Sequence, residues 1–406
     1  MVTHSVYESD NRVRRYAETL VKRGDEVEVL AIAKRDGKTE PNETLSGVTV
    51  HRLQQRMSNE QTKWSYAYQL MRFLVVSAMF LTRNGRQRPY DLIHVHNIPD
   101  FLVLSAWYPK LRGAKLILDI HDIVPELFHN KFPSRLNRFY VFVLKLIEKL
   151  SARFADHVII ANDLWKETII GRSVSKEKCS VVLNHVDPAI FYRRTRTRND
   201  DKLIVIFPGT LQWHQGLDVG IKAFARVREQ FPNAEFHIYG PGGRAIQEEL
   251  RKLVESLGLN DCVRFLGLLR LEQVPQIIAD ADIGVVPKRA DSFGNEAYST
   301  KIMEFMSQGI PVVASRTKID TFYFDDSNVR FFTSGDDHDM ADAMLEVINN
   351  FQVRNELIRN GLTYVECHGW GRQKDRYLDL VDSLTNNQQS SNPVAVAHAN
   401  GPIVRG

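Results

Sequence analysis

Residues 203–239, LIVIFPGTLQWHQGLDVGIKAFARVREQFPNAEFHIY, decide the fold of this chain. Two short apolar runs, LIVIF at 203–207 and EFHIY at 235–239, enclose a longer segment of helical pattern. Strand, helix and strand in this order form the repeating unit of a parallel sheet, in which helices connect neighbouring strands. We therefore expect this stretch to open a doubly wound α/β domain.

The same alternation of apolar runs and amphipathic stretches continues on both sides of this unit. Downstream, the runs that predict further strands lie at 263–266, 283–287, 311–314 and 329–332. Upstream, a first set lies at 2–6, 26–32, 48–53, 92–96, 115–119 and 157–161, with 180–183 as a closing strand. Two sheets of this kind predict an α/β fold with two Rossmann-like, doubly wound domains.

A charged segment without core residues separates the two sets of strands. Residues 193–201 read RRTRTRNDD, which predicts a linker between a first domain at 1–192 and a second at 202–368. A chain of 406 residues has the length of two domains. Residues 369–385 have the pattern of one amphipathic helix, expected to pack back on the first domain, and 386–406 are polar and predicted to be disordered.

Composition and cysteine usage indicate a globular chain in a reducing compartment. Hydrophobic residues make up 43% and charged residues 25%, and no uncharged apolar stretch reaches the roughly 18 residues of a membrane span. Cys179, Cys262 and Cys367 are far apart and show no metal-ligand spacing. The first residues have no signal-peptide pattern. We therefore expect a cytoplasmic location.

Charge is distributed unevenly along the chain. The net charge is only +4, but Lys and Arg exceed Asp and Glu by 10 in residues 1–200 and fall short by 6 in residues 201–406. A basic half attracts anionic lipid, a lipid-linked diphosphate or nucleic acid. Nucleic acid is the weakest of these, because no binding motif and no basic stripe interleaved with aromatics is present. We expect no nucleic-acid partner.

Two segments of the positive half combine apolar and basic residues. The first, 70–81, contains Arg72 and precedes Arg83, Arg86 and Arg88. The second, 139–150, lies among Arg135, Arg138, Lys145, Lys149 and Arg153. Each segment is either an interfacial helix or a core helix with one solvent-exposed face, and the sequence pattern does not decide between these two interpretations. The interfacial interpretation predicts reversible docking on the inner face of an anionic membrane without insertion, which fades as salt rises.

The segment EAYSTKIME at 296–304 is the first candidate for a ligand site. Glu296 lies on a loop after the strand at 283–287, and Glu304 lies in the helix that follows. Each carboxylate accepts hydroxyl hydrogen bonds, which suits a sugar and a ribose. The amides of Ser299, Thr300 and Lys301 would meet a diphosphate between them. The alternative is that both carboxylates only complement the helix dipole.

Six stretches, in the expected order, resemble the GT-B-fold glycosyltransferases, and among them glycosyltransferase family four. They are SDNRVRRYAETLVKRGDEVEVL at 9–30, DLIHVHNIPD at 91–100, LILDIHDIVPE at 116–126, LNHVDPAIF at 183–191, PGTLQWHQGLD at 208–218 and EAYSTKIMEFMSQGIPVVAS at 296–315. The resemblance covers roughly residues 1–385. It implies two Rossmann-like domains that face a central cleft and a retaining transferase.

The resemblance also assigns roles to single residues. It implies that Glu296 contacts the donor sugar and that Glu304 contacts the nucleotide ribose. His121 matches a histidine near the sugar, with a helix-capping or core histidine as the alternative interpretation. Asp122 and Glu126 would orient His121 or bind the acceptor. The remaining expected contacts to the sugar donor are Gly209, Tyr298 and Gly240, and those to the acceptor are Asp10 and Arg12.

The chain departs from the family where phosphates are bound. After the first strand of the second domain the family commonly has an Arg and a Lys, and this chain has Thr210 and Gln215. Lys301 and Lys288 are the proposed substitutes, since a diphosphate needs positive charge. The first domain also has Ser9-Asp10-Asn11-Arg12 where a paired-glycine loop is common, a pattern that resembles one subgroup of the family.

No metal or other cofactor is expected. Asp280 and Asp282 imitate the DxD metal motif of other glycosyltransferases, but they stand where a helix turns into a strand, which indicates capping. The resemblance implies a metal-independent fold class, in which helix amides and basic side chains replace the ion. Gly240-Pro-Gly-Gly243 is a turn whose backbone is able to approach a nucleotide.

The predicted function is transfer of a hexosyl group from a UDP- or GDP-sugar to a polysaccharide or lipid-linked oligosaccharide acceptor. Two alternatives stay open at this point. One is a catalytically silent protein of the same fold that binds a sugar nucleotide as an assembly partner. The other is a different enzyme on this fold, a nucleotide-sugar epimerase or a phosphorylase.

Overall fold

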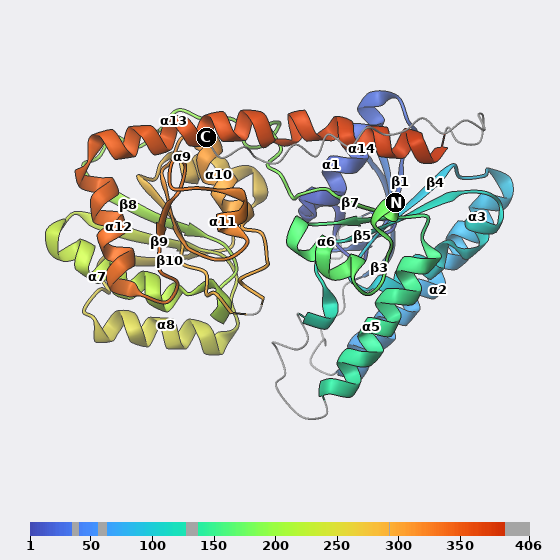
Figure 1. Ribbon diagram of the computed structural model, residues 1–406, viewed down its shortest axis with the longest axis horizontal. Helices are drawn as coiled ribbons and strands as arrows, with labels where there is room; N and C mark the ends of the chain where they lie inside the picture. Colours follow the sequence, from blue (N-terminus) through green and yellow to red (C-terminus); the bar gives the residue numbers. More distant parts are fainter. Residues whose placement is uncertain (35–39, 56–62, 127–136, 292, 386–406) are drawn as a thin grey trace.

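The computed structural model describes residues 1–34, 40–55, 63–126, 137–291 and 293–385. The tail predicted at 386–406 and Arg135 of the second apolar-basic segment lie outside these ranges. The described chain forms two α/β units side by side, each with a parallel sheet between helices (Figure 1). The predicted fold class is confirmed.

The first sheet is parallel except at one edge. Its strands are β1 (Glu28–Ala33), β2 (Asn42–Leu45), β3 (Val48–Gln55), β4 (Leu92–His96), β5 (Lys115–Ile120), β6 (His157–Ile160) and β7 (Cys179–Val181). They form the orders β2-β3-β1 and β4-β5-β6-β7. Val2 joins the two groups because it bridges Leu30 of β1 and Val95 of β4.

Two details of this sheet differ from the predictions. The strand expected at 2–6 is reduced to the bridges of Val2, since residues beyond Thr3 leave the sheet. Strand β2 was not predicted, because its sequence NETL is polar and its residues are largely exposed at the antiparallel edge. Edge strands lack the apolar run that marks a buried parallel strand.

Helices cover both faces of the first sheet. One layer consists of α2 (Lys63–Gln87), the 3-10 helix η2 (Asp100–Ala106), α3 (Trp107–Leu111), α5 (Asn137–Phe154) and α6 (Asp163–Ile170). The opposite layer consists of α1 (Asn11–Arg23) and α14 (Trp370–Thr385). Neighbouring residues of a strand divide between the layers, with Leu116 in one core and Ile117 in the other.

The last helix returns to the first unit. Helix α13 (Phe351–His368) packs on the second unit, and α14 continues from it across the first (Figure 1). The indole Nε1 of Trp370 donates to Thr19 Oγ1 at 3.0 Å, and the Tyr377 hydroxyl lies 3.0 Å from His94 Nδ1. Arg23 and Asp382 form an ion pair at 2.7 Å. Residues 369–385 therefore belong to the packing of the first unit.

The second sheet contains six parallel strands. They are β8 (Leu203–Pro208), β9 (Ala234–Tyr239), β10 (Val263–Gly267), β11 (Ile283–Val286), β12 (Val312–Ser315) and β13 (Arg330–Phe332). Their order is β10-β9-β8-β11-β12-β13, so the chain runs outward from β8 in one direction and resumes at β11 in the other. The carboxyl ends of β8 and β11 form the topological switch point, where open α/β sheets bind ligands.

Helices also cover both faces of the second sheet. One core contains residues of α7 (Leu217–Gln230), α8 (Arg244–Ser256) and α12 (Asp337–Asn349). The other contains residues of α9 (Val274–Ala279) and α10 (Thr300–Gln308), with the short helix α11 (Asp320–Tyr323) beside it. The central strands β8, β11 and β12 thus bury both of their faces, as their near-continuous apolar sequences predict, whereas the edge strand β10 is largely exposed.

Asp280 and Asp282 hold the segment that precedes β8. Asp280 accepts hydrogen bonds from the amide and hydroxyl of Thr197. Asp282 accepts from Arg196, Arg198 and the amide of Ile204. Both carboxylates therefore have a structural role between the predicted linker, 193–201, and the second sheet. Residues 193–201 form neither helix nor strand.

The packing of α14 makes a testable prediction about stability. Tyr377 is fully buried, so Tyr377→Ala should lower the free energy of unfolding by about 3 kcal/mol or more, since it leaves a cavity and an unpaired His94. Urea unfolding followed by circular dichroism measures the loss. Lys374→Ala, at an exposed site of the same helix, should stay within about 0.5 kcal/mol of wild type. Equal losses for both variants would contradict the packing of α14.

Candidate functional site

Two glycines shape the switch point of the second sheet. Gly209 follows β8 and Gly240 follows β9, in a left-handed conformation with φ of 128°. A Cβ on Gly240 would lie 1.8 Å from the Gly209 carbonyl oxygen, and one on Gly209 would lie 2.4 Å from Lys301 Cε. Position 240 requires glycine, whereas a side chain at position 209 would displace the end of the Lys301 side chain, which packs against Gly209.

Lys301 is the cation of this switch point. Its Nζ donates to Gln215 Oε1 at 3.0 Å and lies 5.1 Å from the centre of the Phe207 ring. Burial lowers the Lys301 pKa to about 8, although the neighbouring Glu304 carboxylate acts in the opposite direction. Lys301 thus contacts two of the sequence-predicted residues, Gln215 and Gly209. Thr210, in the same loop, is exposed.

Glu304 lies one turn after Lys301 on α10 and is half-buried. Burial raises the pKa of its carboxyl, while Lys301 and the Thr300 hydroxyl favour the charged form. Thr300 and Lys301 are the first two residues of α10, so their amides belong to the unpaired first turn of the helix. An amine and two helix amides therefore lie at the start of α10, and a carboxylate follows one turn later.

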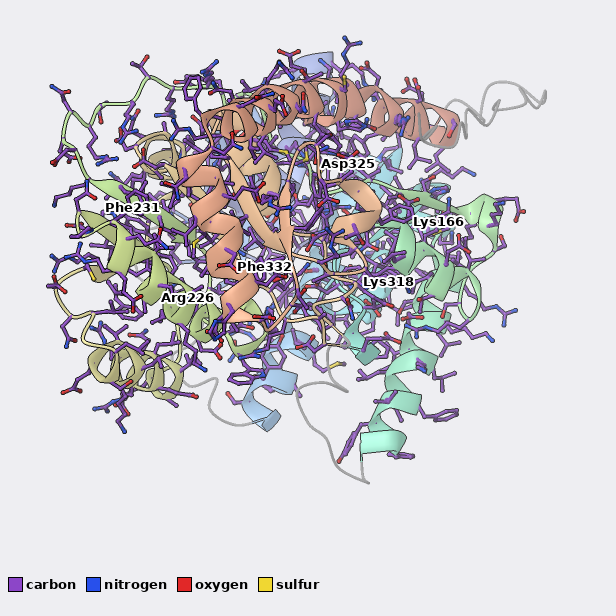
Figure 2. All side chains as sticks on the ribbon, turned by 60° about the vertical axis from the view of Figure 1, so that its left-hand side comes forward. Lys166, Arg226, Phe231, Lys318, Asp325 and Phe332 are labelled. Atoms are coloured by element: carbon purple, nitrogen blue, oxygen red, sulfur yellow. The ribbon has the colours of Figure 1, made fainter. Side chains whose placement is uncertain are left out.

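Glu296 belongs to a loop that Asp291 and Asn295 organise. Asp291 accepts hydrogen bonds from the amides of Phe293 and Gly294, and Asn295 accepts from the amide of Lys318. The Glu296 carboxylate keeps 27% of its exposure and lies 3.6 Å from Lys318 Nζ. Figure 2 labels Lys318 on the second unit and Lys166 on α6 of the first, the two units that this loop joins.

The structure gives Lys288 a different role from the predicted phosphate contact. Its Nζ lies 2.8 Å from Asp320 Oδ2 and donates to the Ala297 carbonyl at 2.7 Å, and the side chain is 4% exposed. The same Asp320 oxygen accepts from Ser299 Oγ at 3.2 Å. Lys288 and the Ser299 hydroxyl therefore hold the loop through the buried Asp320. Because the Ser299 hydroxyl is engaged in this way, only the Ser299 backbone is left to contact a ligand.

The Tyr298 ring packs against two aromatic rings of the second unit, and its sugar contact stays a prediction. The ring lies 5.1 Å from the Tyr323 ring and 6.0 Å from the Phe324 ring. The Tyr298 hydroxyl has no hydrogen-bond partner among the described residues, and burial raises its pKa. We therefore assign Tyr298 to the packing that holds the loop.

His121 stands at the carboxyl end of β5 in the first unit. Its amide donates to Asn97 Oδ1 at 2.7 Å, and 22% of its side chain is exposed. Its Nε2 lies 3.3 Å from Asp119 Oδ2 and 3.1 Å from His96 Nδ1. His121 is thus held through its Nε2, which faces Asp119 and His96. The partly exposed remainder of the imidazole lies at the edge of the sheet.

Asp119 is a fully buried carboxylate held by Arg12. Nε and Nη2 of Arg12 donate to its two oxygens at 2.9 and 2.7 Å. Burial opposes charge, but Arg12 and His121 outweigh it and hold the Asp119 pKa well below its ordinary value. Arg12 is only 4% exposed, so it supports His121 through Asp119. This burial disfavours the direct contact with an acceptor that the sequence predicts for Arg12.

His94, His96 and Asp119 lie close enough together to suggest a metal site among the described residues. The guanidinium of Arg12 already occupies both oxygens of Asp119, however. A cation placed beside this fixed positive charge would be repelled. The cluster is therefore better suited to hold His121 than to bind an ion.

Of the other residues predicted to bind the acceptor, Asp122 lies beside His121 after β5, whereas Asp10 and Glu126 pair with other residues of the first unit. Asp122 follows His121, and burial raises the pKa of its carboxyl. Asp10 caps α1 through the Val13 amide at 3.1 Å and accepts from Ser5 Oγ at 2.6 Å. Glu126 is paired with Arg172 at 2.9 Å. Asp10 and Glu126 thus have structural partners, and their acceptor contacts stay predictions.

The two halves of the site meet through the loop of Glu296. The Asn162 side chain, at the start of α6, donates to the Glu296 carbonyl at 3.0 Å. The Tyr323 hydroxyl donates to Asp163 Oδ2 at 2.7 Å. Strands β5 and β6 are neighbours, with Ile120 opposite Ile160, so the residues after them, His121 and Asn162, share one sheet edge. The carboxyl edges of both sheets therefore face each other here.

Sequence analysis missed the residues that support and join the site. They include Asn97, Asp119, Asn162, Asp163, Asp320 and Tyr323. Three of them carried a signal, because Asn97, Asp119 and Asn162 are polar residues within or directly after buried apolar strands, where they need a partner.

Two family models match the chain, one on each unit. "Glycosyl transferase 4-like domain" matches residues 9–185, and "Glycosyl transferases group 1" matches residues 190–363. The chain belongs to the GT-B glycosyltransferases. Its family is therefore the one indicated by the six motifs, and it is a transferase.

Curated relatives and solved structures agree with this assignment. An uncharacterized glycosyltransferase of Methanocaldococcus jannaschii is 26% identical over 74% of each chain. A D-inositol 3-phosphate glycosyltransferase of Paenarthrobacter aurescens is 23% identical over 92% of this chain and 93% of its own.

Two solved structures share the fold over nearly the whole chain. Sucrose-phosphate synthase of Thermosynechococcus elongatus has a TM-score of 0.76 at 19% identity, over 95% of this chain and 99% of that one. HepE of Anabaena, in complex with UDP-glucose, has a TM-score of 0.70 at 18% identity, over 94% and 98%. At this identity the likeness establishes the fold.

The environment of Lys301 predicts an unusual titration. The group should lose its proton near pH 8 instead of at the ordinary lysine value of 10.5. Since the Glu304 carboxylate stabilises the ammonium, Glu304→Gln should move the pKa still lower. NMR of the labelled lysine side chain measures the pKa. Glu255→Gln, exposed on α8, should leave it unchanged, and a Lys301 that titrates near 10.5 would refute this electrostatic picture.

Proposed function

We propose that this glycosyltransferase moves a hexosyl group, with retention of configuration, from a UDP- or GDP-sugar to a saccharide or lipid-linked oligosaccharide acceptor. The observation that carries the proposal is the start of α10, where Lys301 lies beside Gly209, the first-turn amides are unpaired and Glu304 follows one turn later. This arrangement offers positive charge for a diphosphate and a carboxylate for a ribose. Solved structures of HepE with UDP and with UDP-glucose support a nucleotide-sugar donor.

In the proposed mechanism, the diphosphate lies at the first turn of α10. The amides of Thr300 and Lys301 and the ammonium of Lys301 stabilise the negative charge that develops as the glycosidic bond breaks. Lys301 is already desolvated, so its interaction with phosphate is stronger than that of an exposed lysine. These groups supply the charge compensation that a metal ion provides in other transferases, and we propose that no metal is needed.

The remaining residues act on the sugar. Glu296 is proposed to accept hydrogen bonds from the donor sugar, which requires its weak 3.6 Å contact with Lys318 to give way. His121 lies at the facing edge of the first sheet and is proposed to border the reacting face of the sugar. The donor phosphate itself serves as the base in this proposal, so no side chain is assigned as nucleophile.

A catalytically silent sugar-nucleotide-binding protein is the second candidate. The feature that favours it is Gln215, which accepts a hydrogen bond from Lys301 at a position where the family commonly has a cation. Transfer to an acceptor distinguishes the enzyme from a binding protein. Release of UDP without an acceptor, together with a changed sugar, would indicate an epimerase instead.

Location and acceptor belong to the same proposal. We propose that the enzyme works in the cytoplasm, peripherally on the inner face of a membrane, because a lipid-linked acceptor is held there. The positive charge of residues 1–200 favours this placement.

The two carboxylates of the 296–304 segment make the first functional prediction. After a thermal-shift screen has found the sugar nucleotide, Glu296→Gln and Glu304→Gln should each lower transfer by about ten-fold or more. Loss of a carboxylate hydrogen bond costs roughly 1.5 to 3 kcal/mol, and 1.4 kcal/mol corresponds to ten-fold. Glu255→Gln is the matched control. Wild-type turnover in both variants would refute the assigned roles.

Lys301 makes the second functional prediction. Lys301→Ala should weaken UDP or GDP binding much more than binding of the free nucleoside, because the lost contact is to phosphate. In the wild type, affinity for the diphosphate should be full below pH 8 and fall as the pH rises through the Lys301 pKa of about 8.

Calorimetry at several pH values measures both effects. Lys301→Arg should bind with an affinity that no longer falls near pH 8, since arginine stays charged. Lys222→Ala, exposed on α7, should behave as wild type. Equal losses for diphosphate and nucleoside would mean that Lys301 does not contact phosphate.

A further inference from the structure

Exposed large hydrophobic side chains gather on one layer of the first unit. Thirteen of the twenty such side chains among the described residues belong to α2, η2, α3 and α5. They include Met71, Val75, Met79, Trp107, Phe142 and Leu146, each at least 46% exposed. We call this surface the α2–α5 face. The opposite layer, α1 and α14, contributes none of the twenty.

The four elements form one continuous surface. Helix η2 contacts α2 on one side and α5 on the other, and α3 contacts α2. Through η2, the helices α2 and α5 therefore belong to one layer of the first unit. Inward-facing residues such as Phe73, Leu102 and Ala152 anchor the layer on the sheet. The exposed apolar side chains are thus additional to a core that is already packed.

Unpaired positive charges border the apolar side chains. Arg72 and Arg83 on α2, and Lys145 and Lys149 on α5, are exposed and form no ion pair among the described residues. Lys145 and Lys149 each directly precede an exposed leucine on α5. Arg88, in contrast, is paired with Glu26 and contributes little free charge. Apolar side chains bordered by free cations match the interface of an anionic bilayer.

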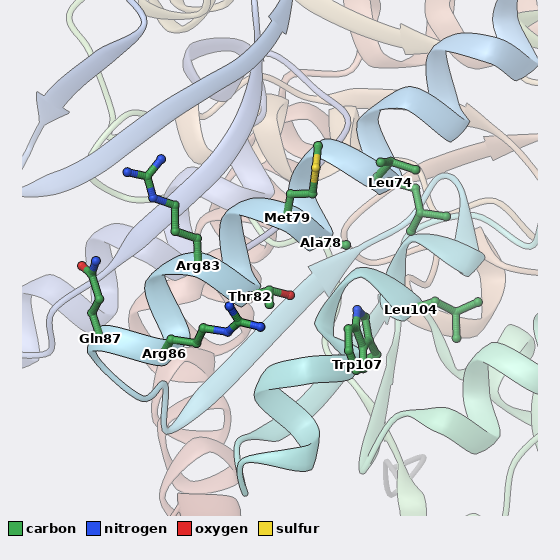
Figure 3. Close-up of a pocket in the computed structure, with 10 residues that line it drawn as sticks. Leu74, Ala78, Met79, Thr82, Arg83, Arg86, Gln87, Leu104 and Trp107 are labelled. Atoms are coloured by element: carbon green, nitrogen blue, oxygen red, sulfur yellow. The ribbon is translucent and has the colours of Figure 1, made fainter.

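The centre of this face is hollowed into a groove of about 690 Å³. Figure 3 shows Leu74, Ala78 and Thr82 of α2 opposite Leu104 and Trp107, with Arg83 and Arg86 toward the end of the helix. An apolar groove with arginines at one end suits an anionic lipid. The acyl chain would contact the apolar side chains, and the headgroup would contact the arginines. Within the described residues no helix is long and apolar enough to cross a membrane.

We propose that the α2–α5 face docks on an anionic membrane surface and inserts its exposed apolar side chains into the headgroup and upper acyl region. The groove between α2 and α3 takes up part of an anionic phospholipid, with the headgroup at Arg83 and Arg86. This differs from docking by charge alone, because burial of apolar side chains is not screened by salt. This docking rests on the membrane location in the proposed function, but vesicle binding is measured without any transfer, so its failure would leave the proposed reaction untouched.

Co-sedimentation of the full chain with vesicles tests the proposal. Phosphatidylcholine vesicles that contain phosphatidylglycerol should bind the protein strongly at low salt and retain a measurable fraction at high salt. A variant with Val75→Ser, Met79→Ser, Phe142→Ser and Leu146→Ser should bind the vesicles with an affinity lower by about ten-fold or more. High salt should release this variant fully. A variant with Arg83→Gln, Arg86→Gln, Lys145→Gln and Lys149→Gln should lose the preference for phosphatidylglycerol.

Matched controls separate the face from general hydrophobicity and charge. Leu268→Ser with Phe351→Ser removes two exposed apolar side chains of the second unit, and Lys222→Gln with Lys252→Gln removes two of its exposed charges. Both control variants should bind vesicles as wild type. All substituted side chains are exposed, so unfolding midpoints should not change.

Insertion has a direct readout in Trp107, which is 47% exposed beside the groove. Phospholipids brominated on the acyl chains should quench its fluorescence, and Trp107→Phe should remove most of that quenching. Complete release of the wild type by salt, with no quenching, would overturn insertion. Failure to bind anionic vesicles even at low salt would overturn the docking itself.

One further outcome assigns the face to another occupant. If the protein is dimeric by light scattering, and the four-serine variant is monomeric while its vesicle binding is unchanged, the α2–α5 face is a contact between two copies of the chain. That result would overturn the membrane proposal.

Discussion

A parallel β-sheet can be connected only by crossovers, and the site depends on this constraint. Every crossover returns the chain to the same end of the sheet, so all strands present their carboxyl ends at one edge. Gly209 follows β8 and Lys288 follows β11. These two strands are neighbours in the sheet, although α7, β9, α8, β10 and α9 separate them in the sequence. Lys301 reaches the same point because α10 is the crossover from β11 to β12. Rearranging any of these strands would disperse the site.

Buried charge pairs make the edges rigid. Asp119 with Arg12 stands behind His121, and Asp320 with Lys288 stands behind the loop of Glu296. Removing one partner of such a pair costs several kcal/mol because the other is left charged and desolvated. Lys301 differs from these residues, since its hydrogen bond is to the neutral Gln215 and burial lowers its pKa. A ligand phosphate would compensate the charge of Lys301, whereas the paired cations have no need of one.

The sequence predicted the parts of the protein that depend on local pattern. Buried parallel strands are apolar along their length, so twelve strands were located, whereas the polar edge strand β2 was missed. The partners of site residues could not be predicted where they are distant in the sequence. Arg12 lies 107 positions from Asp119, and Glu126 lies 46 from Arg172, so no local pattern separates these paired charges from free ones. The pairing of Lys301 with Gln215, across 86 positions, was equally invisible.

The two layers of the first sheet have different tasks, and this difference orients the molecule. Helix α14 ties one layer to the second unit, and this layer carries none of the exposed large hydrophobic side chains of the described residues. The opposite layer carries the exposed apolar and basic side chains. The second half of the chain has an excess of 6 acidic residues and is repelled by an anionic surface that attracts the first half. A molecule held through the α2–α5 face therefore keeps its second unit away from the lipid. The facing sheet edges, which lie between the two units, then remain open to both a soluble nucleotide sugar and an acceptor at the membrane.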